Sequence, residues 1–533
     1  KGSRTTANLF ILQTLIERQL SLGQNLFVVF VDFKKAFDIM NRDILFYKMI
    51  KSGLKGRVVN TLRNLYHKTF FRVKHGGQLS ARILQELGVN QGGNASPTIF
   101  REYMADLKQY LHQQHGVCLS EDEILLHLLW ADDLILISTT LKGCQLQLNG
   151  LQTFCSKNQC IVNEIKTKLM IFGIHQEVIL KFNNKTIEQV KEYKYVGNIV
   201  RSTHKSISDV FSNNFAYLCG KAKQAIFSLK LKLRKIGTLP PKCMFYLFHS
   251  LIQPILTYGS DVWGVSKSGR EAVDKVLLWY LRMVLNVKAT TSNSITLGEC
   301  GVIPTSVTCI VNAIVFFQRL KLMPELNIVN MAFREQERLH NLGFRTWYGR
   351  VLDLARIYGF DMEALLTKDQ IRERVTNAFI NHWAAKVQDP ITSPLLRTYS
   401  QIKCEFGIEP YLLLIKNVKF RNSFAKLRAS SHTLEIERGR HTRPKTLLCD
   451  RLRSSCNEVE NEEYFLLSCR KYTADRNHLF HAISKQYPNF RDMCHNDKFV
   501  FLMSNQSPQI LTWTGKFIYN AFIKRALPNT QEL

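Results

Sequence analysis

Two adjacent acidic residues set between apolar runs constrain the fold of this chain most strongly. Asp132 and Asp133 stand between residues 127–131 and 134–138, and both flanks are short and rich in Leu and Ile. Such flanks predict a buried strand on either side of a tight turn. An acid pair can simply mark a turn or a helix start, but carboxylates between buried strands are costly unless they serve exposed chemistry. The pattern predicts a hairpin that carries both acids at its tip and could hold metal.

A second apolar run, residues 26–31, also ends in a carboxylate. It leads into Asp32 and the segment 32–38, which reads Asp-Phe-Lys-Lys-Ala-Phe-Asp. Three carboxylates delivered by strand ends can hold two divalent cations, which activate an attacking 3′-hydroxyl and stabilise a leaving pyrophosphate. Magnesium prefers all-oxygen ligands of this kind. Asp32, Asp132 and Asp133 are therefore predicted to bind two Mg²⁺ ions.

The order of three segments is more specific than any one of them. The first acid-tipped run is followed by residues 88–97, Gly-Val-Asn-Gln-Gly-Gly-Asn-Ala-Ser-Pro, and then by the acid-tipped hairpin. With these motifs the chain resembles the reverse transcriptases of non-LTR (LINE-type) retrotransposons, whose palm motifs read approximately D-F-x-K-A-F-D, G-x-x-Q-G-x-x-x-S-P and Y/F-A-D-D. Residues 162–170, 193–197 and 256–264 resemble further family segments, so the resemblance covers nearly the whole chain.

The resemblance implies a fold class and a division of the chain. The fold would be α+β, a right-hand polymerase palm in which a small antiparallel sheet is backed by helices, followed by a helical thumb and a largely helical C-terminal region. The predicted segments are a palm with partial fingers at 1–200, a thumb at 201–300, a helical connection at 301–430 and a C-terminal region at 431–533.

The resemblance also implies roles for single residues. Phe37 would be a steric gate against a 2′-hydroxyl, with Phe33 beside it in the nucleotide site; without the motif, a core role would be favoured for Phe37. Gln91 and Gly92 would position the nucleotide, because glycine lets the backbone approach closely. Lys166 would donate a proton to departing pyrophosphate, whereas an isolated lysine is usually solvated surface.

The segment after residue 88 also predicts a helix. Ser96 would cap it and Pro97 would fill its first position. The following apolar residues keep a helical stripe that predicts packing under the sheet; they are Ile99, Tyr103, Leu107 and Leu111.

The C-terminal region resembles a family segment that usually carries C-x-x-C, a His and a final Cys. Cys456 and Cys469 match, but Arg453 stands at the first cysteine position and Tyr464 at the histidine position. Tetrahedral zinc needs four donors, so we predict buried thiols rather than a zinc site. Other donors could in principle complete a set, with spacing unlike that of the family: Cys449 with His441, His478 or His481.

The charge of the chain indicates a polyanionic partner. Its 533 residues contain 72 Lys and Arg against 43 Asp and Glu, a formal net charge of +29. An excess of this size favours nucleic acid, and the resemblance implies an RNA template, a DNA primer or target, and deoxynucleoside triphosphates. A basic helix that packs on one side and faces phosphates on the other is predicted around Lys221, Lys223, Lys230, Lys232 and Arg234, although a solvated face is the simpler interpretation of any one lysine.

Location follows from apolar windows, cysteines and the resemblance. No window reaches 18 uninterrupted apolar residues, so no membrane span is predicted. The 13 scattered cysteines are typical of reduced thiols in an intracellular protein. The resemblance implies a nuclear protein with a cytoplasmic ribonucleoprotein stage.

The first residues bear on activity. The start of the chain, residues 1–7, resembles a segment that in the family follows finger motifs and, further upstream, an endonuclease domain, so we expect an N-terminally truncated chain with incomplete fingers. The predicted function is RNA-directed DNA synthesis, and the alternative is a catalytically inactive nucleic-acid-binding relic. An RNA-dependent RNA polymerase shares the palm but usually carries Gly where this chain has Ala131 and a polar residue where it has Phe37.

Overall fold

The computed structural model describes residues 5–90, 92–120, 123–173, 177–203, 210–389, 396–439, 452–453 and 456–526. The chain forms two compact units, each built from separate stretches. The first contains Lys1–Tyr217, Gly259–Ser266 and Ala313–Leu365, and the second contains Leu218–Tyr258, Lys267–Asn312 and Leu366–Leu533. The α+β fold class is confirmed, while the division into four consecutive segments stays a prediction.

The first unit holds the large sheet and most of the strands. Its strands are β1 (Leu26–Val31), β2 (Phe70–Phe71), β3 (Lys74–His75), β4 (Gln78–Leu79), β5 (Ile83–Leu84), β6 (Val117–Cys118), β7 (Ile124–Leu125), β8 (His127–Trp130), β9 (Asp133–Ser138), β10 (Lys168–Phe172), β11 (Leu180–Phe182), β12 (Lys185–Gln189), β13 (Glu192–Tyr195) and β14 (Asn198–Arg201). Its helices are α1 (Thr5–Ser21), α2 (Arg42–Lys51), α3 (Gly56–Tyr66), α4 (Ser96–Met104), α5 (Leu141–Asn158), α9 (Ser260–Trp263), α13 (Ile328–Asn341) and α14 (Trp347–Ile357).

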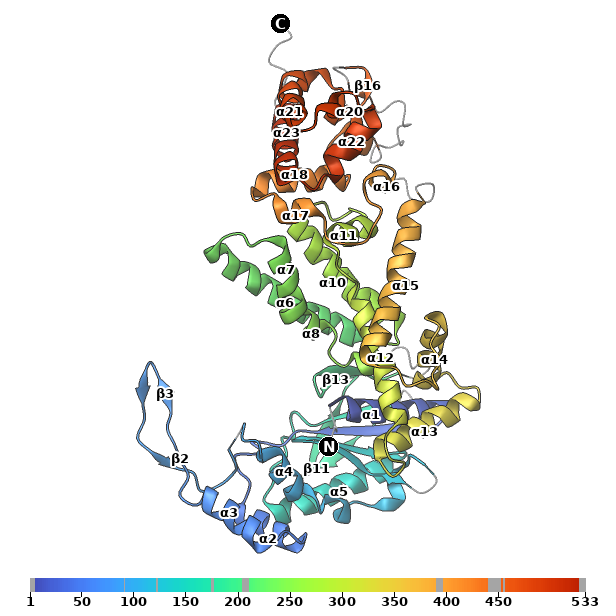
Figure 1. Cartoon of the computed structure of the whole chain (residues 1–533). Coiled ribbons are helices and arrows are strands. Elements are labelled where there is room, and N and C mark those ends of the chain that lie inside the picture. The colour runs from blue at the N-terminus through green and yellow to red at the C-terminus, as the bar shows by residue number, and fades with distance from the viewer. Residues whose placement is uncertain are drawn as a thin grey trace. The chain divides into compact units, whose positions relative to one another are not determined.

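The large sheet is mostly antiparallel and has β1 near its middle. Its strand order is β11-β12-β10-β1-β9-β8, and only β10 and β12 run parallel. Strands β8 and β9 form the hairpin that the sequence predicts, with Trp130 opposite Asp133. Figure 1 shows α4 and α5 on one side of this sheet and α1 on the other.

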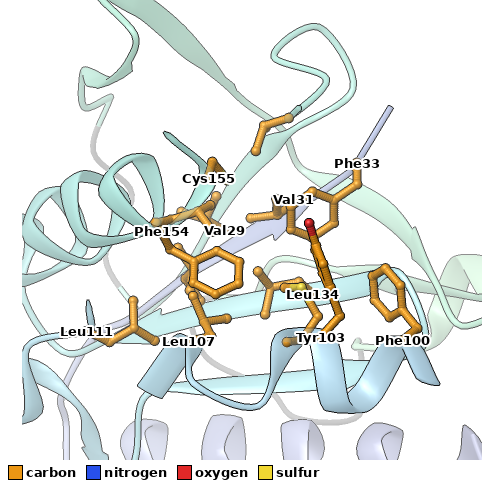
Figure 2. Packing of buried hydrophobic residues seen from close by; sticks show 14 of the residues in the cluster. Val29, Val31, Phe33, Phe100, Tyr103, Leu107, Leu111, Leu134, Phe154 and Cys155 are labelled. Carbon is orange, nitrogen blue, oxygen red and sulfur yellow. The ribbon is translucent and has the colours of Figure 1, made fainter. Parts of the chain in front are cut away.

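Alternate residues of β1 serve two different faces of the sheet, as a pleated strand requires. Phe27, Val29 and Val31 join the large core cluster that α4 and α5 complete. All six residues of β1 are buried, so helices or strands cover both of its faces. Figure 2 shows part of this cluster, in which side chains from β1, β9, α4, α5 and the segments beside them pack together; it includes Val29, Val31, Phe33, Phe100, Tyr103, Leu107, Leu111, Leu134, Phe154 and Cys155.

The helix after residue 95 differs from its expected start. Helix α4 begins at Ser96, and Pro97 occupies its first turn, but the residue that caps it is Ala95. The hydroxyl of Ser96 instead donates to the carbonyl of Asn90, 2.5 Å away. The predicted capping role of Ser96 is therefore wrong, because this residue already has helical geometry. The predicted apolar stripe is buried, although Leu107 and Leu111 lie beyond the end of α4.

A buried carboxylate ties the late segment of the first unit to its first helix. Glu17 of α1 is fully buried. Its oxygens accept hydrogen bonds from Arg350 at 2.7 Å, from the Trp347 amide at 3.0 Å and from Gln336 at 2.5 Å. Since those donors lie more than 300 residues away, residues 313–365 are an integral part of the unit that contains the large sheet.

The second unit is almost entirely helical. Its elements are α7 (Pro241–Leu247), the π-helical turn Phe248–Ile252, α8 (Gln253–Leu256), α10 (Lys267–Leu285), α11 (Asn293–Cys300), α15 (Lys368–Gln388), α16 (Tyr399–Ile402), α17 (Pro410–Leu414), α18 (Val418–Arg428), α19 (Glu435–Arg438), β15 (Leu452–Arg453), β16 (Glu458–Val459), α20 (Glu462–Leu467), α21 (Thr473–Gln486), α22 (His495–Ser504) and α23 (Pro508–Ala526). Helices α6 (Ser212–Ile236) and α12 (Thr305–Lys321) contribute residues to both units.

An ion network occupies the interior of the second unit. Arg428 of α18 is fully buried and lies 2.8 Å from Glu299 and 2.7 Å from Glu409. Both carboxylates compensate the charge of the guanidinium, as a buried ion requires.

Within the described residues, no single helix is long and apolar enough to cross a membrane, although one bent pair, α11 with α12, reaches the required length and composition together.

Candidate active site

The structure places the three predicted carboxylates at neighbouring strand ends of the large sheet. Val31 of β1 lies opposite Leu134 of β9, so Asp32 comes beside Asp133 in the antiparallel register. Although part of Asp133 is open to solvent, desolvation of its carboxyl and the nearby charges of Asp132 and Asp32 raise its pKa to about 6, against an opposing effect of Lys194. The hairpin tip and the end of β1 therefore share one electrostatic environment.

A strained turn presents the acid pair. Ala131 and Asp132 are the two residues between β8 and β9, and Ala131 has a positive φ of 52°. Tight hairpin turns of this length need positive φ at the first central residue, a position that glycine normally fills. The side chain of Ala131 makes this conformation unfavourable, and the pairing of Trp130 with Asp133 holds it in place.

The backbone of Asp32 is fixed by residues of a distant segment. The amide of Asn163 donates to the Asp32 carbonyl at 2.7 Å, and the Asp32 amide donates to the Thr167 hydroxyl at 3.3 Å. Next to it, Phe33 forms a bridge with Val162. The segment that contains Lys166 thus acts on Asp32 through its backbone and through Thr167, for which the sequence indicates no role.

The remaining predicted residues occupy different environments. Lys166 is exposed, one residue from Thr167. Phe33 is only 7% exposed and packs in the core cluster, whereas Phe37 is half-buried, with its ring 4.9 Å from that of Phe100. Gly92 has a positive φ of 82°. Gln91 lies outside the described residues, and the roles of all five stay predictions.

A glycine keeps the loop of Phe37 in place. Gly88 has a φ of +76°, and a Cβ there would lie 2.4 Å from the Asp38 carbonyl oxygen and 2.5 Å from that of Phe37. The neighbouring Val89 amide donates to the Phe37 carbonyl at 2.8 Å. Only glycine allows this approach, so the loop at 37–40 and the segment at 88–89 form one unit of structure.

An arginine that sequence reasoning missed secures the same region. The guanidinium of Arg42 donates to the carbonyls of Tyr66 and Gln85, both at 2.8 Å, and to that of Gly88 at 2.8 Å. It also reaches Leu87 at 3.3 Å. These are contacts to backbone atoms of residues that no local pattern links to Arg42, which is why its role is not visible in the sequence.

A second hairpin flanks the acids. Tyr193 of β13 stacks on Phe30 with 4.3 Å between ring centroids and 16° between planes. Burial and the charges of Asp32 and Asp133 raise the pKa of Tyr193 to about 12. With Lys194 beside it, the 193–197 segment supplies one aromatic ring and one cation at the acid site. The segment resembled a family motif, but the sequence indicated no role for these two residues.

The acid site is not a ready-made metal cluster. Over the ranges that the structure describes, no three His, Cys, Asp or Glu side chains are grouped closely enough to hold one ion. The donor chemistry nevertheless suits Mg²⁺, since all three groups are carboxylates. Desolvation is the main reason that the pKa of Asp133 is raised, and a bound cation would offset the smaller contribution from the charges of Asp132 and Asp32.

The predicted basic helix is present in α6. Lys221, Lys223, Lys230, Lys232 and Arg234 are exposed, and they lie on both flanks of an apolar stripe that contains buried Ala222 and Ile226 with half-buried Leu229 and Leu233. The helix and its apolar stripe are present as predicted, whereas the cations are not gathered on one opposite face. These cations belong to the second unit and the acid site to the first, so their role toward nucleic acid stays a prediction.

The C-terminal cysteines do lie together. The Sγ atoms of Cys456 and Cys469 are 4.0 Å apart, and Tyr464 hydrogen-bonds to Cys456. The phenol of Tyr464 thus lies beside the two thiols. It occupies the position at which the family segment usually carries histidine. His441 and Cys449 lie outside the described residues, as does the side chain of Arg453.

Comparison with known proteins identifies the domain to which this site belongs. Residues 3–200 match the family described as "Reverse transcriptase (RNA-dependent DNA polymerase)". This range contains all three acids and the hairpin that carries Tyr193 and Lys194. It also contains the segment 162–167, which contacts Asp32, and the segment 88–89, which contacts Phe37. The chain therefore contains a reverse transcriptase domain.

Two curated proteins that are similar to this chain indicate which kind of reverse transcriptase it resembles. The chain is 23% identical over 300 residues to the "Retrovirus-related Pol polyprotein from type-1 retrotransposable element R2" of Popillia japonica, covering 54% of this chain and 47% of that protein. It is 23% identical over 266 residues to the "RNA-directed DNA polymerase from mobile element jockey" of Drosophila funebris, covering 48% and 28%. Both relatives are named as proteins of retrotransposable or mobile elements, which supports the resemblance to non-LTR reverse transcriptases. The chain spans less than half the length of these relatives.

A solved structure is also similar over part of the chain. It is the telomerase of Candida albicans in complex with a fragment of telomeric RNA, at 11% identity and a TM-score of 0.24, covering 64% of this chain and 58% of that one. A similarity of this degree adds nothing to the assignment.

Proposed function

We propose that this chain is an RNA-directed DNA polymerase that extends a DNA 3′ end along an RNA template. The observation that carries the proposal is the register of β1 and β9, which brings Asp32 beside Asp133 at the tip of the hairpin. Three carboxylates from two strands, electrostatically coupled and open to solvent on one side, suit metal-assisted nucleotidyl transfer.

Each predicted residue of the acid site would have a separate role in the reaction. Asp32, Asp132 and Asp133 would hold two Mg²⁺ ions, which supply charge stabilisation for the attacking hydroxyl and the leaving pyrophosphate. Phe37 would exclude a ribose 2′-hydroxyl by leaving no room for it. Lys166 is exposed near the backbone of Asp32 and would protonate pyrophosphate.

The nucleotide and the nucleic acid would use further groups. Gln91 and Gly92 would position the nucleotide, and Phe33 would belong to the same nucleotide site. The exposed cations of α6 would bind the phosphates of the template and primer. With an RNA template, a DNA primer or target and deoxynucleoside triphosphates as partners, the protein would act in the nucleus after a cytoplasmic ribonucleoprotein stage.

One observation favours the alternative of an inactive nucleic-acid-binding relic. It is the lack of a grouped metal-binding set among the described residues. In a relic the charge and the fold would persist while turnover is lost.

Primer extension separates the two candidates. The chain is incubated with a DNA primer on an RNA template, deoxynucleotides and Mg²⁺, alongside Asp132→Asn and the control Glu177→Gln, which removes an exposed carboxylate elsewhere in the first unit. We expect extension by the parent and by the control, and loss of at least two orders of magnitude in Asp132→Asn. No extension by any of the three, with salt-sensitive RNA binding intact, would establish the relic.

Metal binding provides a readout without turnover. Titration of Mn²⁺ into the chain, followed by calorimetry, should show binding that Asp132→Asn weakens and Glu177→Gln leaves unchanged. Equal binding by all three proteins would contradict a metal role for the acid pair.

A further inference from the structure

A long two-stranded ribbon in the first unit is exposed on both of its faces. It consists of residues 70–84, here called the arm, in which β2 pairs with β5 and β3 pairs with β4. Figure 1 shows the arm, in blue, extending away from α3. Every residue of the arm is exposed except Ser80, which is half-buried. Because a bare two-stranded ribbon is at best marginally stable in water, a surface of this kind indicates a binding function.

The geometry of the arm is specified by its sequence. Gly76 and Gly77 form its tip, and both have positive φ, 55° and 85°, as a tight hairpin turn requires. Phe71 pairs with Ile83, but Lys74 pairs with Leu79, so the register changes by one residue between the two ladders. This places Ala81 and Arg82 opposite Arg72, in the manner of a bulge, which twists the ribbon and brings two arginines to its middle.

The charge around the arm has one sign. Residues 44–85 contain no Asp or Glu, and their cations are Lys48, Lys51, Lys55, Arg57, Arg63, Lys68, Arg72, Lys74 and Arg82. In a chain where Asp and Glu make up 43 of 533 residues, 42 consecutive positions without one would be expected to be uncommon. A uniformly positive segment disfavours a basic protein partner, including a second copy of this chain, and favours a polyanion.

Aromatic rings stand among these cations. Phe70 is 50% exposed and Phe71 is 47% exposed, and they lie on opposite faces of the ribbon because they are neighbours on one strand. Bases of a single strand can stack on such rings while Lys and Arg contact the phosphates. In a duplex the bases are already stacked on each other, so no base face is free to stack on these rings.

The root of the arm is connected to the acid site. Arg42 donates to the Tyr66 carbonyl before β2 and to the Gln85 and Gly88 carbonyls after β5, which holds both ends of the arm on α2. The residue after Gly88 donates to the Phe37 carbonyl. The arm therefore has a fixed origin at the loop that carries Phe37.

We propose that the arm is a binding surface for single-stranded nucleic acid, with Phe70 and Phe71 stacking on bases and Arg72, Lys74 and Arg82 contacting phosphates. The naming of that strand as the template rests on the proposed function, whereas binding itself does not.

The test is the binding of a fluorescein-labelled, unstructured 20-nucleotide RNA, measured by anisotropy over a range of salt concentrations. The charge variant is Arg72→Gln with Lys74→Gln and Arg82→Gln. Its matched control removes three exposed cations of α15 in the second unit, by Lys368→Gln, Arg372→Gln and Lys386→Gln. The ring variant, Phe70→Leu with Phe71→Leu, keeps apolar bulk and removes the aromatic faces.

The charge variant should weaken binding at least tenfold at roughly 0.1 M salt and lower the slope of log Kd against log salt by about two, since each lost phosphate contact on a single strand is worth about 0.7. The ring variant should weaken binding about fivefold or more with an unchanged slope. The α15 control should change binding less than about twofold.

Equal losses in the arm and α15 variants would overturn the inference, because they would reveal only general electrostatics. RNA binding that is unchanged in the arm variants would overturn it as well. Light scattering and duplex DNA binding would then show whether the arm serves self-association or duplex DNA instead.

All measurements are repeated with Asp132→Asn. Arm-dependent binding without extension by the parent would refute the polymerase proposal alone, while extension with arm-independent binding would refute the arm alone.

Discussion

The hydroxyl of Thr167 accepts a hydrogen bond from the backbone amide of Asp32, with 3.3 Å between the two atoms. Thr167 is 1% exposed, so no solvent replaces this bond if the hydroxyl is lost. The contact joins a carboxylate-bearing strand end to a segment 135 residues later, and it makes Thr167 a positioning residue for the acid site.

Thr167→Val should leave the Asp32 amide without a partner at almost unchanged side-chain volume. We expect it to lower the free energy of unfolding by about 1–3 kcal/mol, and to slow primer extension. Thr167→Ser keeps the hydroxyl and serves as control. Urea unfolding and steady-state extension rates measure both effects, and a valine variant as stable and active as the serine variant would contradict the role.

Gly88→Ala should be far more damaging than alanine at another positive-φ glycine. A Cβ at Gly88 would meet the backbone of Phe37 and Asp38 at 2.4–2.6 Å, whereas at Gly53, with φ +86°, no heavy atom of the described chain lies within 4 Å. Both substitutions carry the cost of left-handed backbone, about 1–2 kcal/mol, and only Gly88→Ala adds a backbone clash. Thermal unfolding of the two variants gives the comparison; equal losses would mean that the 37–40 loop can move aside.

Glu17 and Arg350 should be coupled. Glu17→Gln leaves Arg350 without its buried counter-ion, 2.7 Å away, and should cost about 3–5 kcal/mol of unfolding free energy. Replacing both by methionine should cost less than the sum of Glu17→Met and Arg350→Met, because no uncompensated charge then remains. Denaturant titration of the two single variants and the double variant gives the coupling energy. Additive losses would show that the two side chains act independently.

His127 should make stability fall on acidification. Burial, with a smaller effect of Lys108, lowers the pKa of His127 from 6.5 to about 4. The imidazole is therefore protonated at a lower pH in the folded chain than in the unfolded chain. Stability from this group is complete above about pH 6.5 and is lost as the pH falls toward 4, by at most about 1.4 kcal/mol per pH unit. His127→Gln should flatten that part of the profile. An identical pH dependence of unfolding in the two proteins would show that His127 does not titrate in this window.

Local patterns were sufficient for the parts of the site that lie on single strands. The apolar flanks of Asp132 and Asp133 predicted the β8–β9 hairpin, and the run before Asp32 predicted β1, because burial of alternate or continuous apolar residues leaves a direct trace in sequence. The sequence also predicts the helix after residue 95, but Ser96 does not cap it, because its hydroxyl donates to the carbonyl of Asn90.

Contacts between distant segments produce no recognisable pattern in the sequence. Arg42 bonds four backbone carbonyls, and a carbonyl is present at every position, so nothing in the sequence marks the ones that are used. The approach of Gly88 to Phe37 and Asp38 shows the same limit: the glycine is visible, but its neighbour is not.

The charged groups and the segments that can form buried strands are apparent from the amino-acid order alone: the three acids, the positive excess, and the acid-free stretch around the arm. Which of these groups meet depends on the folded chain. The tertiary structure set Asp32 against Asp133 through strand register, fixed Asp32 through Thr167, and left Phe70 and Phe71 exposed. The reason is physical: side-chain chemistry and periodicity are properties of short segments, whereas register, desolvation and exposure depend on what the rest of the chain places alongside them.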